Sequence, residues 1–334
     1  MQIAVIYSKL SRRMRATKYG ETDEDSAVIA NKVVESLQFL GHKARILEIN
    51  EDHIDEIGGI RADCIFNLIE WCGQDIHLSE IAFGYLRKLK IPVTGSSEEL
   101  FVLTGDKVRM KAELQKQKIS TPYGISFETG DEPIPPNLPY PMIVKPSLEH
   151  CSIGLSHDSI AHNDSELQQI AKRQIVTFNQ PALAEEFIEG REFLVYLIEE
   201  KDEVRVLPIE EVVFQGGNLR SFQTYEAKWE TDNPDYQSTK VQLAMLSSEE
   251  QKIVESMCKT AFRKMGLSGY SRFDVRYKNN TPYILETNAN PSVYDTDNEA
   301  QDINDEVIWG IKFPDYLDKI VESAVWHFEK GELV

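Results

Sequence analysis

The sequence predicts an α/β protein in which a parallel N-terminal domain precedes a mixed α+β region. Within the first 95 residues, apolar strand-like runs alternate with segments of helical periodicity, which is typical of an open parallel sheet with crossover connections. From residue 192 onward, strand-like segments dominate instead. The length of 334 residues corresponds to about two domains and is enough to bury substantial cores.

The predicted N-terminal domain covers residues 1–95. An apolar run at 2–7 predicts a buried strand, and a helical pattern over 23–40 ends at Gly41. The remaining elements are strands over 44–49, 63–68 and 91–94 and a helix over 76–88. Strand and helix therefore alternate through the whole domain.

The rest of the chain is expected to form a central subdomain over 96–180 and a C-terminal subdomain over 181–334. A helix at about 105–117 leads to a proline-rich connector over 133–141, which must be a loop. The other central elements are a strand over 141–145, a helix over 164–172 and a strand over 182–188. The C-terminal elements are strands over 192–199, 204–213, 271–277 and 282–286 and helices at about 248–265 and 313–330.

The chain is strongly acidic, with 55 Asp and Glu against 36 Lys and Arg and a formal net charge of −19. Such a chain repels phosphate backbones and anionic lipid, so neither nucleic acid nor a membrane is expected as a partner. The N-terminus lacks a signal-peptide pattern, and no stretch reaches the roughly 18 apolar residues of a membrane helix. We therefore expect a cytoplasmic protein whose four cysteines, which form no CxxC pair, are free thiols.

A hairpin is predicted over 270–292, with its turn centred on Asn280. In that register four polar side chains project from one face, paired as Arg272 with Asn288 and Asp274 with Glu286. Two carboxylates and an amide oxygen are hard ligands that suit Mg²⁺ or Mn²⁺. The arginine beside them could stabilise a developing oxyanion. The pattern favours a metal site, and the alternative is a salt-bridge ladder on the protein surface.

Two further segments indicate a cleft that binds phosphate and a nucleotide. Lys145 ends a buried strand and presents a point charge, and the polar loop 147–154 that follows has backbone amides that can cover phosphate oxygens. The strand 185–188 could meet an adenine edge, with Glu192 placed for ribose hydroxyls. Taken alone, each segment also has a plain structural interpretation, as a lysine at a strand end and an acidic strand end.

Two short motifs complete the series. Thr94-Gly95-Ser96 is followed by Gly105-Asp106-Lys107, and Tyr225-Glu226-Ala227-Lys228 lies further along the chain. In this order the segments resemble the ATP-grasp superfamily, and specifically the D-alanine–D-alanine ligase family, over about residues 85–330. The resemblance implies an ATP-grasp fold, in which an N-terminal parallel α/β domain and two α+β subdomains, central and C-terminal, enclose ATP.

The resemblance also implies ATP and Mg²⁺ as cofactors and a role for each matching residue. The implied nucleotide-binding residues are Lys107, Lys145, Glu185, Glu186, Phe187, Ile188, Glu192 and Lys228. The implied metal ligands are Asp274, Glu286 and Asn288. The implied catalytic residues are Arg272, Lys228 of the lid and Ser152 of the loop that closes over the phosphates.

The implied activity is that of an ATP-dependent carboxylate–amine ligase. ATP phosphorylates a carboxylate to an acyl phosphate, and an amine attacks it to form an amide or peptide bond. Small amino-acid-like substrates and a homodimer are expected from the family. The alternatives are a nucleotide-binding regulatory protein without ligase activity, a carboxylate kinase on the same fold, and a D-alanine–D-alanine ligase proper.

The departures from the family pattern fall on the substrate side. The family's glycine-rich turn and amine-anchoring Glu are replaced by a basic segment, and the Glu position falls near Thr22. His150 and Cys151 replace Gly and Ser in the closing loop, and Trp229 replaces the Tyr of the lid. Substrates other than two D-alanines are therefore expected.

Two hypotheses about those substrates follow. The first concerns the arginines of the basic segment, which are Arg12, Arg13 and Arg15. Either one of them binds an anionic group of the carboxylate substrate, or the segment is a solvated turn. Asp297 falls where the family holds the second substrate's carboxylate, close to Asp295, Glu299 and Asp302. Like charges repel, so this position would favour an acceptor with an additional positive group.

Overall fold

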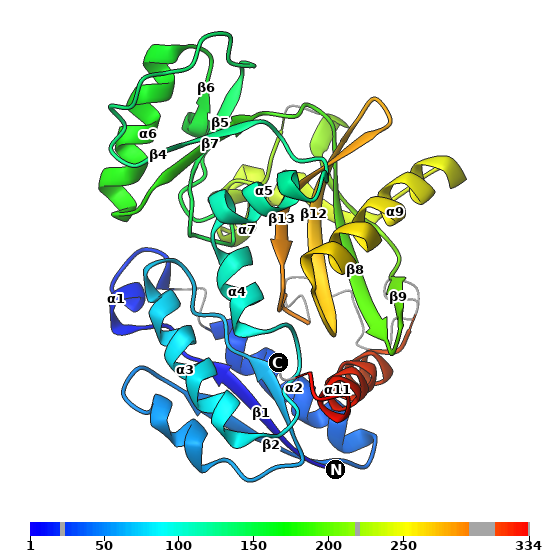
Figure 1. Cartoon of the computed structure of the whole chain (residues 1–334). Helices are drawn as coiled ribbons and strands as arrows, with labels where there is room; N and C mark the ends of the chain where they lie inside the picture. Colours follow the sequence, from blue (N-terminus) through cyan, green and yellow to red (C-terminus); the bar gives the residue numbers. More distant parts are fainter. Residues whose placement is uncertain (21–23, 218–220, 294–310, 333–334) are drawn as a thin grey trace.

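The computed structural model describes residues 1–20, 24–217, 221–293 and 311–332. Three β-sheets succeed one another along the chain, and helices pack on their faces (Figure 1). Thr22, Asp295, Asp297, Glu299 and Asp302 lie outside the described residues, so the hypotheses on these positions stay predictions. Among the described helices, none is long and apolar enough to cross a membrane.

The N-terminal sheet is parallel, in the order β2-β1-β3. Its strands are β1 (Gln2–Ser8), β2 (Lys43–Ile49) and β3 (Cys64–Leu68). The helices of this region are α1 (Arg12–Arg15), α2 (Glu24–Phe39), α3 (Ile76–Leu89) and α4 (Glu98–Gly105). The strand predicted over 91–94 is only a single parallel bridge between Val93 and Ile65.

The central sheet is antiparallel, in the order β4-β7-β5-β6. Its strands are β4 (Gly124–Phe127), β5 (Met142–Pro146), β6 (Ile160–Ala161) and β7 (Ala182–Glu186). Helix α5 (Lys107–Lys116) precedes it, and α6 (Asp164–Phe178) packs on it. The short strand β4 was not predicted, because GISF is only four residues long and its alternation rests on two apolar positions.

The C-terminal sheet has the order β11-β10-β8-β12-β13, with β9 also paired to β8. Its strands are β8 (Arg191–Glu200), β9 (Glu203–Val206), β10 (Glu210–Phe214), β11 (Thr239–Leu243), β12 (Tyr270–Lys278) and β13 (Thr281–Asn288). The single strand predicted over 204–213 is two strands. Pro208 lies in the interruption and has no N–H to donate to a ladder.

Three further helices accompany this sheet. They are α7 (Tyr225–Trp229), α8 (Pro234–Ser238) and the long α9 (Ser248–Met265). Ser247 and Glu250 form a capping box at the start of α9, and Gly266, with φ of 80°, ends it. The last helix, α11 (Phe313–Glu329), returns to the N-terminal region and packs against α2 (Figure 1). One buried cluster therefore joins residues from both ends of the chain, such as Val5 and Leu317.

Candidate active site

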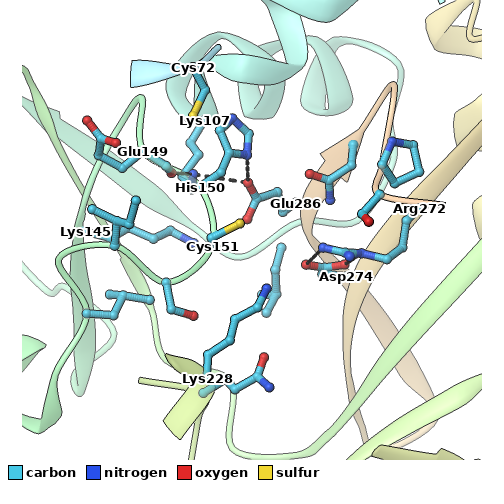
Figure 2. Close-up of a pocket in the computed structure, with 18 of the residues that line it drawn as sticks. Cys72, Lys107, Lys145, Glu149, His150, Cys151, Lys228, Arg272, Asp274 and Glu286 are labelled. Carbon is cyan, nitrogen blue, oxygen red and sulfur yellow. Dashed lines mark hydrogen bonds and ion pairs between the residues drawn. The ribbon is translucent and has the colours of Figure 1, made fainter. Parts of the chain in front are cut away.

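A cavity of about 810 Å³ opens between the three sheets and receives residues from each of them (Figure 2). The β12–β13 hairpin supplies one wall, β5 and the loop after it a second, and the N-terminal region a third. Helix α7 contributes Lys228, whose long side chain extends into the cavity from the side opposite His150 (Figure 2). The polar residues that the sequence singled out from distant segments therefore meet in one place.

The hairpin presents its polar face to this cavity. Arg272 pairs with Asn288 and Asp274 with Glu286, as the sequence predicted, and all four line the cavity. The residues between them, Phe273 and Thr287, are fully buried on the other face. Alternation along the two strands therefore separates a polar, cavity-facing side from a core-facing side.

The register near the turn differs from the prediction. Asn279 and Asn280 form a two-residue turn with φ of 50° and 59°, which suits asparagine in a tight hairpin. The turn is therefore centred half a residue earlier than predicted. A bulge at Leu285, between the pairs Val275–Ile284 and Asp274–Glu286, restores the predicted pairing.

Glu286 lies among positive groups. Its Oε1 is 3.2 Å from Lys107 Nζ and 2.6 Å from His150 Nδ1. Burial alone would raise the pKa of the Glu286 carboxyl, but Lys107 and His150 outweigh burial and hold its pKa well below the usual range. The carboxylate is therefore charged at neutral pH and available to a cation.

Asp274 is paired with its neighbour on the strand. Arg272 Nε donates to Asp274 Oδ1 at 2.7 Å and its Nη2 donates to Oδ2 at 3.2 Å. Burial would lower the pKa of Arg272, but Asp274 and Tyr196 outweigh it and raise the pKa well above the usual value. A metal ion bound to Asp274 would therefore compete with this arginine.

The donor set fits a hard divalent cation. Glu286 and Asn288 both line the cavity. Glu286 Oε1 is paired with Lys107 and His150, and the buried Nδ2 of Asn288 has no hydrogen-bond partner among the described residues. The described residues hold no cluster of three His, Cys, Asp or Glu suited to a metal ion. The third oxygen donor beside Asp274 and Glu286 would therefore be the amide of Asn288, as is common for Mg²⁺ or Ca²⁺ and uncommon for zinc.

Lys145, the next-to-last residue of β5, faces the cavity, with its Nζ 2.5 Å from Glu185 Oε1. Lys111 of α5 contacts the other carboxylate oxygen, Oε2, at 2.6 Å. Burial would raise the pKa of Glu185, but the two lysines together lower it. The carboxylate of Glu185 is thus held by two lysines, and its backbone lies within the sheet, paired with β4 on one side and β5 on the other.

The loop after Lys145 is fastened to the N-terminal region. Glu149 is buried, accepts a hydrogen bond from Gln180 at 2.7 Å, and lies where any side chain at Gly73 would clash. Gly73 N also donates to Leu148 O at 3.0 Å. Cys151 and Ser152 both have positive φ, 56° and 60°, which is unusual for residues other than glycine, and Ile153 N donates to His150 O at 3.0 Å within this tight turn.

Helix α7, which the sequence analysis assigned to a lid, packs onto that loop. Thr224 caps its first turn, and Trp229 Nε1 donates to Cys151 O at 3.0 Å. Tyr225 stacks edge-on against Tyr19, with ring centroids 4.9 Å apart. The lid is therefore in contact with both the closing loop and the N-terminal region, and Lys228 lies under it at the cavity.

The strand-end segment predicted to bind adenine also lines the cavity; its residues there are Glu186, Phe187, Ile188 and Glu192. Phe187 packs against Phe222 with ring centroids 5.7 Å apart, which provides an apolar surface for a base. Glu192 Oε2 is 2.6 Å from Arg276, yet burial raises the pKa of Glu192 on balance. Ribose hydroxyls would therefore meet a carboxylate already held in place by an arginine.

The arginines of the N-terminal segment do not line the cavity. Arg12 is paired with Glu51 at 3.2 Å and also with Asp52, and Arg13 Nη2 is 3.0 Å from Asp75 Oδ1. Arg15 is exposed. The cavity is instead lined here by Leu10 and Met14. This geometry gives no support to the hypothesis of a substrate-binding arginine, because the short helix α1 turns its basic side chains toward acidic partners or solvent.

Sequence reasoning missed two residues of the site. Lys111 lies four positions after Lys107 on α5, so helical spacing alone places the two lysines on one face. His150 was noted only as a replacement for glycine in the loop after Lys145, and its contact with Glu286 was not anticipated. The contact of Lys111 with Glu185 and that of His150 with Glu286 each join different elements, so spacing within one element cannot predict them.

The comparisons with known proteins agree with this geometry. A family model described as "D-ala D-ala ligase C-terminus" matches residues 128–322. A D-alanine–D-alanine ligase of Thermotoga petrophila is 28% identical over 100% of this chain and 99% of its own length. An uncharacterised protein, y4sG, of Sinorhizobium fredii is 29% identical over 79% of each chain.

Solved structures show the same fold. A D-alanine–D-alanine ligase from Bacillus anthracis has a TM-score of 0.77 at 20% identity and covers 99% of each chain. The VanG D-Ala:D-Ser ligase from Enterococcus faecalis has a TM-score of 0.73 at 20% identity, over 97% of this chain and 99% of its own. The predicted ATP-grasp fold is confirmed, and the chain belongs to the D-alanine–D-alanine ligase C-terminal family.

Proposed function

We propose that this protein is an ATP-dependent, ADP-forming carboxylate–amine ligase that uses substrates other than two D-alanines. The observation that carries the proposal is the meeting, in one cavity, of three lysines from different segments with the Asp274, Glu286 and Asn288 set. In a chain with net charge −19, this local group of cations is what a triphosphate requires. The family of the chain supports the same reaction class.

In this proposal the lysines bind phosphate. Lys107 and Lys145 are buried beside the closing loop, and Lys228 approaches from the lid, so the triphosphate would be held from several sides. Ser152 of the loop also lines the cavity and would contact phosphate oxygens of the nucleotide. Glu186, Phe187, Ile188 and Glu192 would hold the adenosine.

The metal ligands would be Asp274, Glu286 and Asn288. Mg²⁺ bound there would supply charge neutralisation at the phosphates. Arg272 lies beside the ligands and would polarise the acyl oxygen of the reacting carboxylate. The acyl phosphate would then lose phosphate when the amine nitrogen attacks the acyl carbon, and the lid would keep water out of that step.

The substrates are proposed to be small, amino-acid-like carboxylates and amines. The wall that would meet the carboxylate substrate carries Leu10, Met14 and Ile29, which favours an apolar group on that substrate. The names of the relatives already include both D-alanine–D-alanine and D-Ala:D-Ser ligases, so the second substrate varies within this fold. We also propose domain boundaries at about residue 95 and between β7 and β8, with the lid and metal ligands in the third part, because the expected boundary at 180 would separate β7 from the rest of the central sheet.

The test is an ADP-release screen of carboxylates crossed with amines at fixed Mg²⁺. ADP formation that requires both substrates, with an amide product found by mass spectrometry, is the expected result. ADP formation without an amine would indicate a carboxylate kinase instead. Tight nucleotide binding with no turnover for any pair would favour the regulatory alternative. The Glu286→Gln protein serves as the control for contaminating ATPase.

A further inference from the structure

Three buried charges lie beneath the phosphate end of the cavity. Lys111 is 4% exposed, Glu185 1% and Lys145 7%. The two lysines come from different elements, α5 and β5, and share one carboxylate on β7 through separate oxygens, at 2.6 Å and 2.5 Å. Such a group is costly to bury unless each charge has a partner, so its composition calls for an explanation.

Only part of this group reaches the cavity. Lys145 and Glu185 are among the lining residues, whereas Lys111 is not. Lys111 Nζ donates to Thr121 Oγ1 at 2.8 Å, and that hydroxyl in turn donates to Ile284 O at 2.8 Å. Lys111 is therefore fixed from behind and cannot itself touch a ligand in the cavity.

Charge balance indicates what the second lysine does. A buried carboxylate paired with one lysine forms a neutral pair, and that lysine would then offer little net charge to a phosphate. With two lysines on one carboxylate, the group carries a net charge of about +1. Burial lowers the pKa of Lys111 to about 8 and Glu185 opposes the shift, so Lys111 remains mainly protonated at pH 7.

We propose that Lys111 is a positioning residue for nucleotide binding, which shares Glu185 so that Lys145 keeps a net positive charge toward the nucleotide phosphates. The inference rests on the proposed function, since it needs a nucleotide at Lys145. Glu185 bridges the two lysines through separate oxygens, and the charge of Lys111 prevents this carboxylate from neutralising Lys145.

A purely structural role makes a different prediction. In that case Lys111 would only compensate a buried acid and fasten α5 to the sheet, and its loss would weaken binding of adenosine and of the triphosphate alike. If Lys111 acts through charge, its loss weakens triphosphate binding and leaves adenosine binding unchanged. Removing the carboxylate as well should then restore the triphosphate affinity.

The experiment measures, by calorimetry, the binding of adenosine and of a non-hydrolysable ATP analogue with Mg²⁺ to the full-length protein. The variants are Lys111→Met, Glu185→Gln and the double variant. Lys111→Met is expected to weaken analogue binding at least about 10-fold, and the double variant to return within about 3-fold of wild type. Lys116→Met, an exposed lysine of the same helix, is the matched control and should bind as wild type.

Several outcomes would overturn the inference. They are unchanged analogue binding by Lys111→Met, an equal loss for adenosine, and a double variant as weak as the single one. If Lys111→Met does not fold, Glu185→Gln alone remains decisive. It should bind the analogue at least as tightly as wild type, and a 10-fold loss would contradict the charge argument. Failure of wild type to bind any nucleotide would instead reject the proposed function.

Discussion

The β12–β13 hairpin and the segment around α1 both border the same cavity, yet their charged residues behave differently. On the hairpin, Arg272, Asp274 and Glu286 face the cavity. Around α1, the arginines are directed to Glu51, Asp52 and Asp75 or to solvent, and apolar side chains line the cavity. Charged residues in a sequence predict a binding site only where the local backbone determines the direction of each side chain.

Physical regularity explains the difference. In paired strands successive side chains alternate, so the facing direction of four residues follows from register alone. A four-residue helix after a strand has no such constraint, and its orientation depends on tertiary contacts such as the hydrogen bond from Ser11 to Asp75 at 2.5 Å. The two walls of the cavity can therefore be compared directly by mutation.

The largest effect is expected on the hairpin. Glu286→Gln and Asn288→Ala should each lower Mg²⁺-dependent turnover by at least about 10²-fold, because each removes an oxygen donor from the proposed metal site. Initial rates of ADP release over a Mg²⁺ titration measure this, and circular dichroism checks the fold. Turnover close to wild type in either protein would show that the polar face of the hairpin does not bind the metal.

A loss of activity is also expected when Lys228 of the lid is replaced. Lys228→Ala should lower kcat by about 10²-fold, since a cation that neutralises transition-state charge is removed. The same substitution should leave the melting temperature nearly unchanged, because Lys228 is only partly buried. A normal kcat with a raised KM for ATP would place this lysine in ground-state binding alone.

The N-terminal wall of the cavity, where Leu10 and Met14 lie, is expected to contact the carboxylate substrate through apolar side chains. Met14→Ala should raise the KM for the carboxylate substrate by about 10-fold, as expected for a lost apolar contact, and leave the KM for ATP unchanged. Arg15→Gln, one position along and exposed, is the matched control and should change neither constant. The reverse pattern would mean that the basic residues, and not the apolar ones, meet the substrate.

A modest gain is expected at the replaced glycine of the closing loop. His150→Gly should tighten Mg²⁺ binding about 3-fold, because His150 Nδ1 lies 2.6 Å from Glu286 and competes for this carboxylate. Calorimetric titration with Mg²⁺ gives the change directly. His157→Gly, an exposed histidine paired with Asp235, provides the control. Weaker Mg²⁺ binding in His150→Gly would indicate that the imidazole supports the metal site.

The smallest effect lies away from both walls and concerns stability. His327 of α11 contacts Glu199 at 2.7 Å and Glu332 at 2.5 Å, and the bond to Glu199 in particular raises its pKa although burial opposes this. The raised pKa stabilises the folded state fully below about pH 6.5, and this contribution disappears as pH rises through the folded-state pKa.

His327→Gln should therefore lower the free energy of unfolding by about 1 kcal/mol at pH 6 and by much less at pH 9, without changing turnover. Urea unfolding at the two pH values measures it. A loss that is equal at both would show that the histidine stabilises α11 by packing and not by charge.

The sequence predicted the site best where regular structure carries it. The pairing of Asp274 with Glu286 was correct, although the turn lies half a residue away from its predicted centre and the bulge at Leu285 compensates. The family resemblance supplied the order of the lysine segments. The sharing of Glu185 by two lysines and the contact of His150 with Glu286 could not be predicted, because each depends on how separate subdomains approach one another.

The packing of α11 against the N-terminal region has a consequence for folding during synthesis. Phe313, Leu317 and Ile320 complete the apolar cluster that β1 and α2 begin, so the N-terminal sheet packs against a helix that is synthesised only after all three sheets. Until then the emerging N-terminal sheet keeps an uncovered apolar face, which is the condition in which chaperones bind nascent chains. A chain that ends before α11 would retain that face permanently, so premature termination would yield an aggregation-prone fragment and not a smaller enzyme.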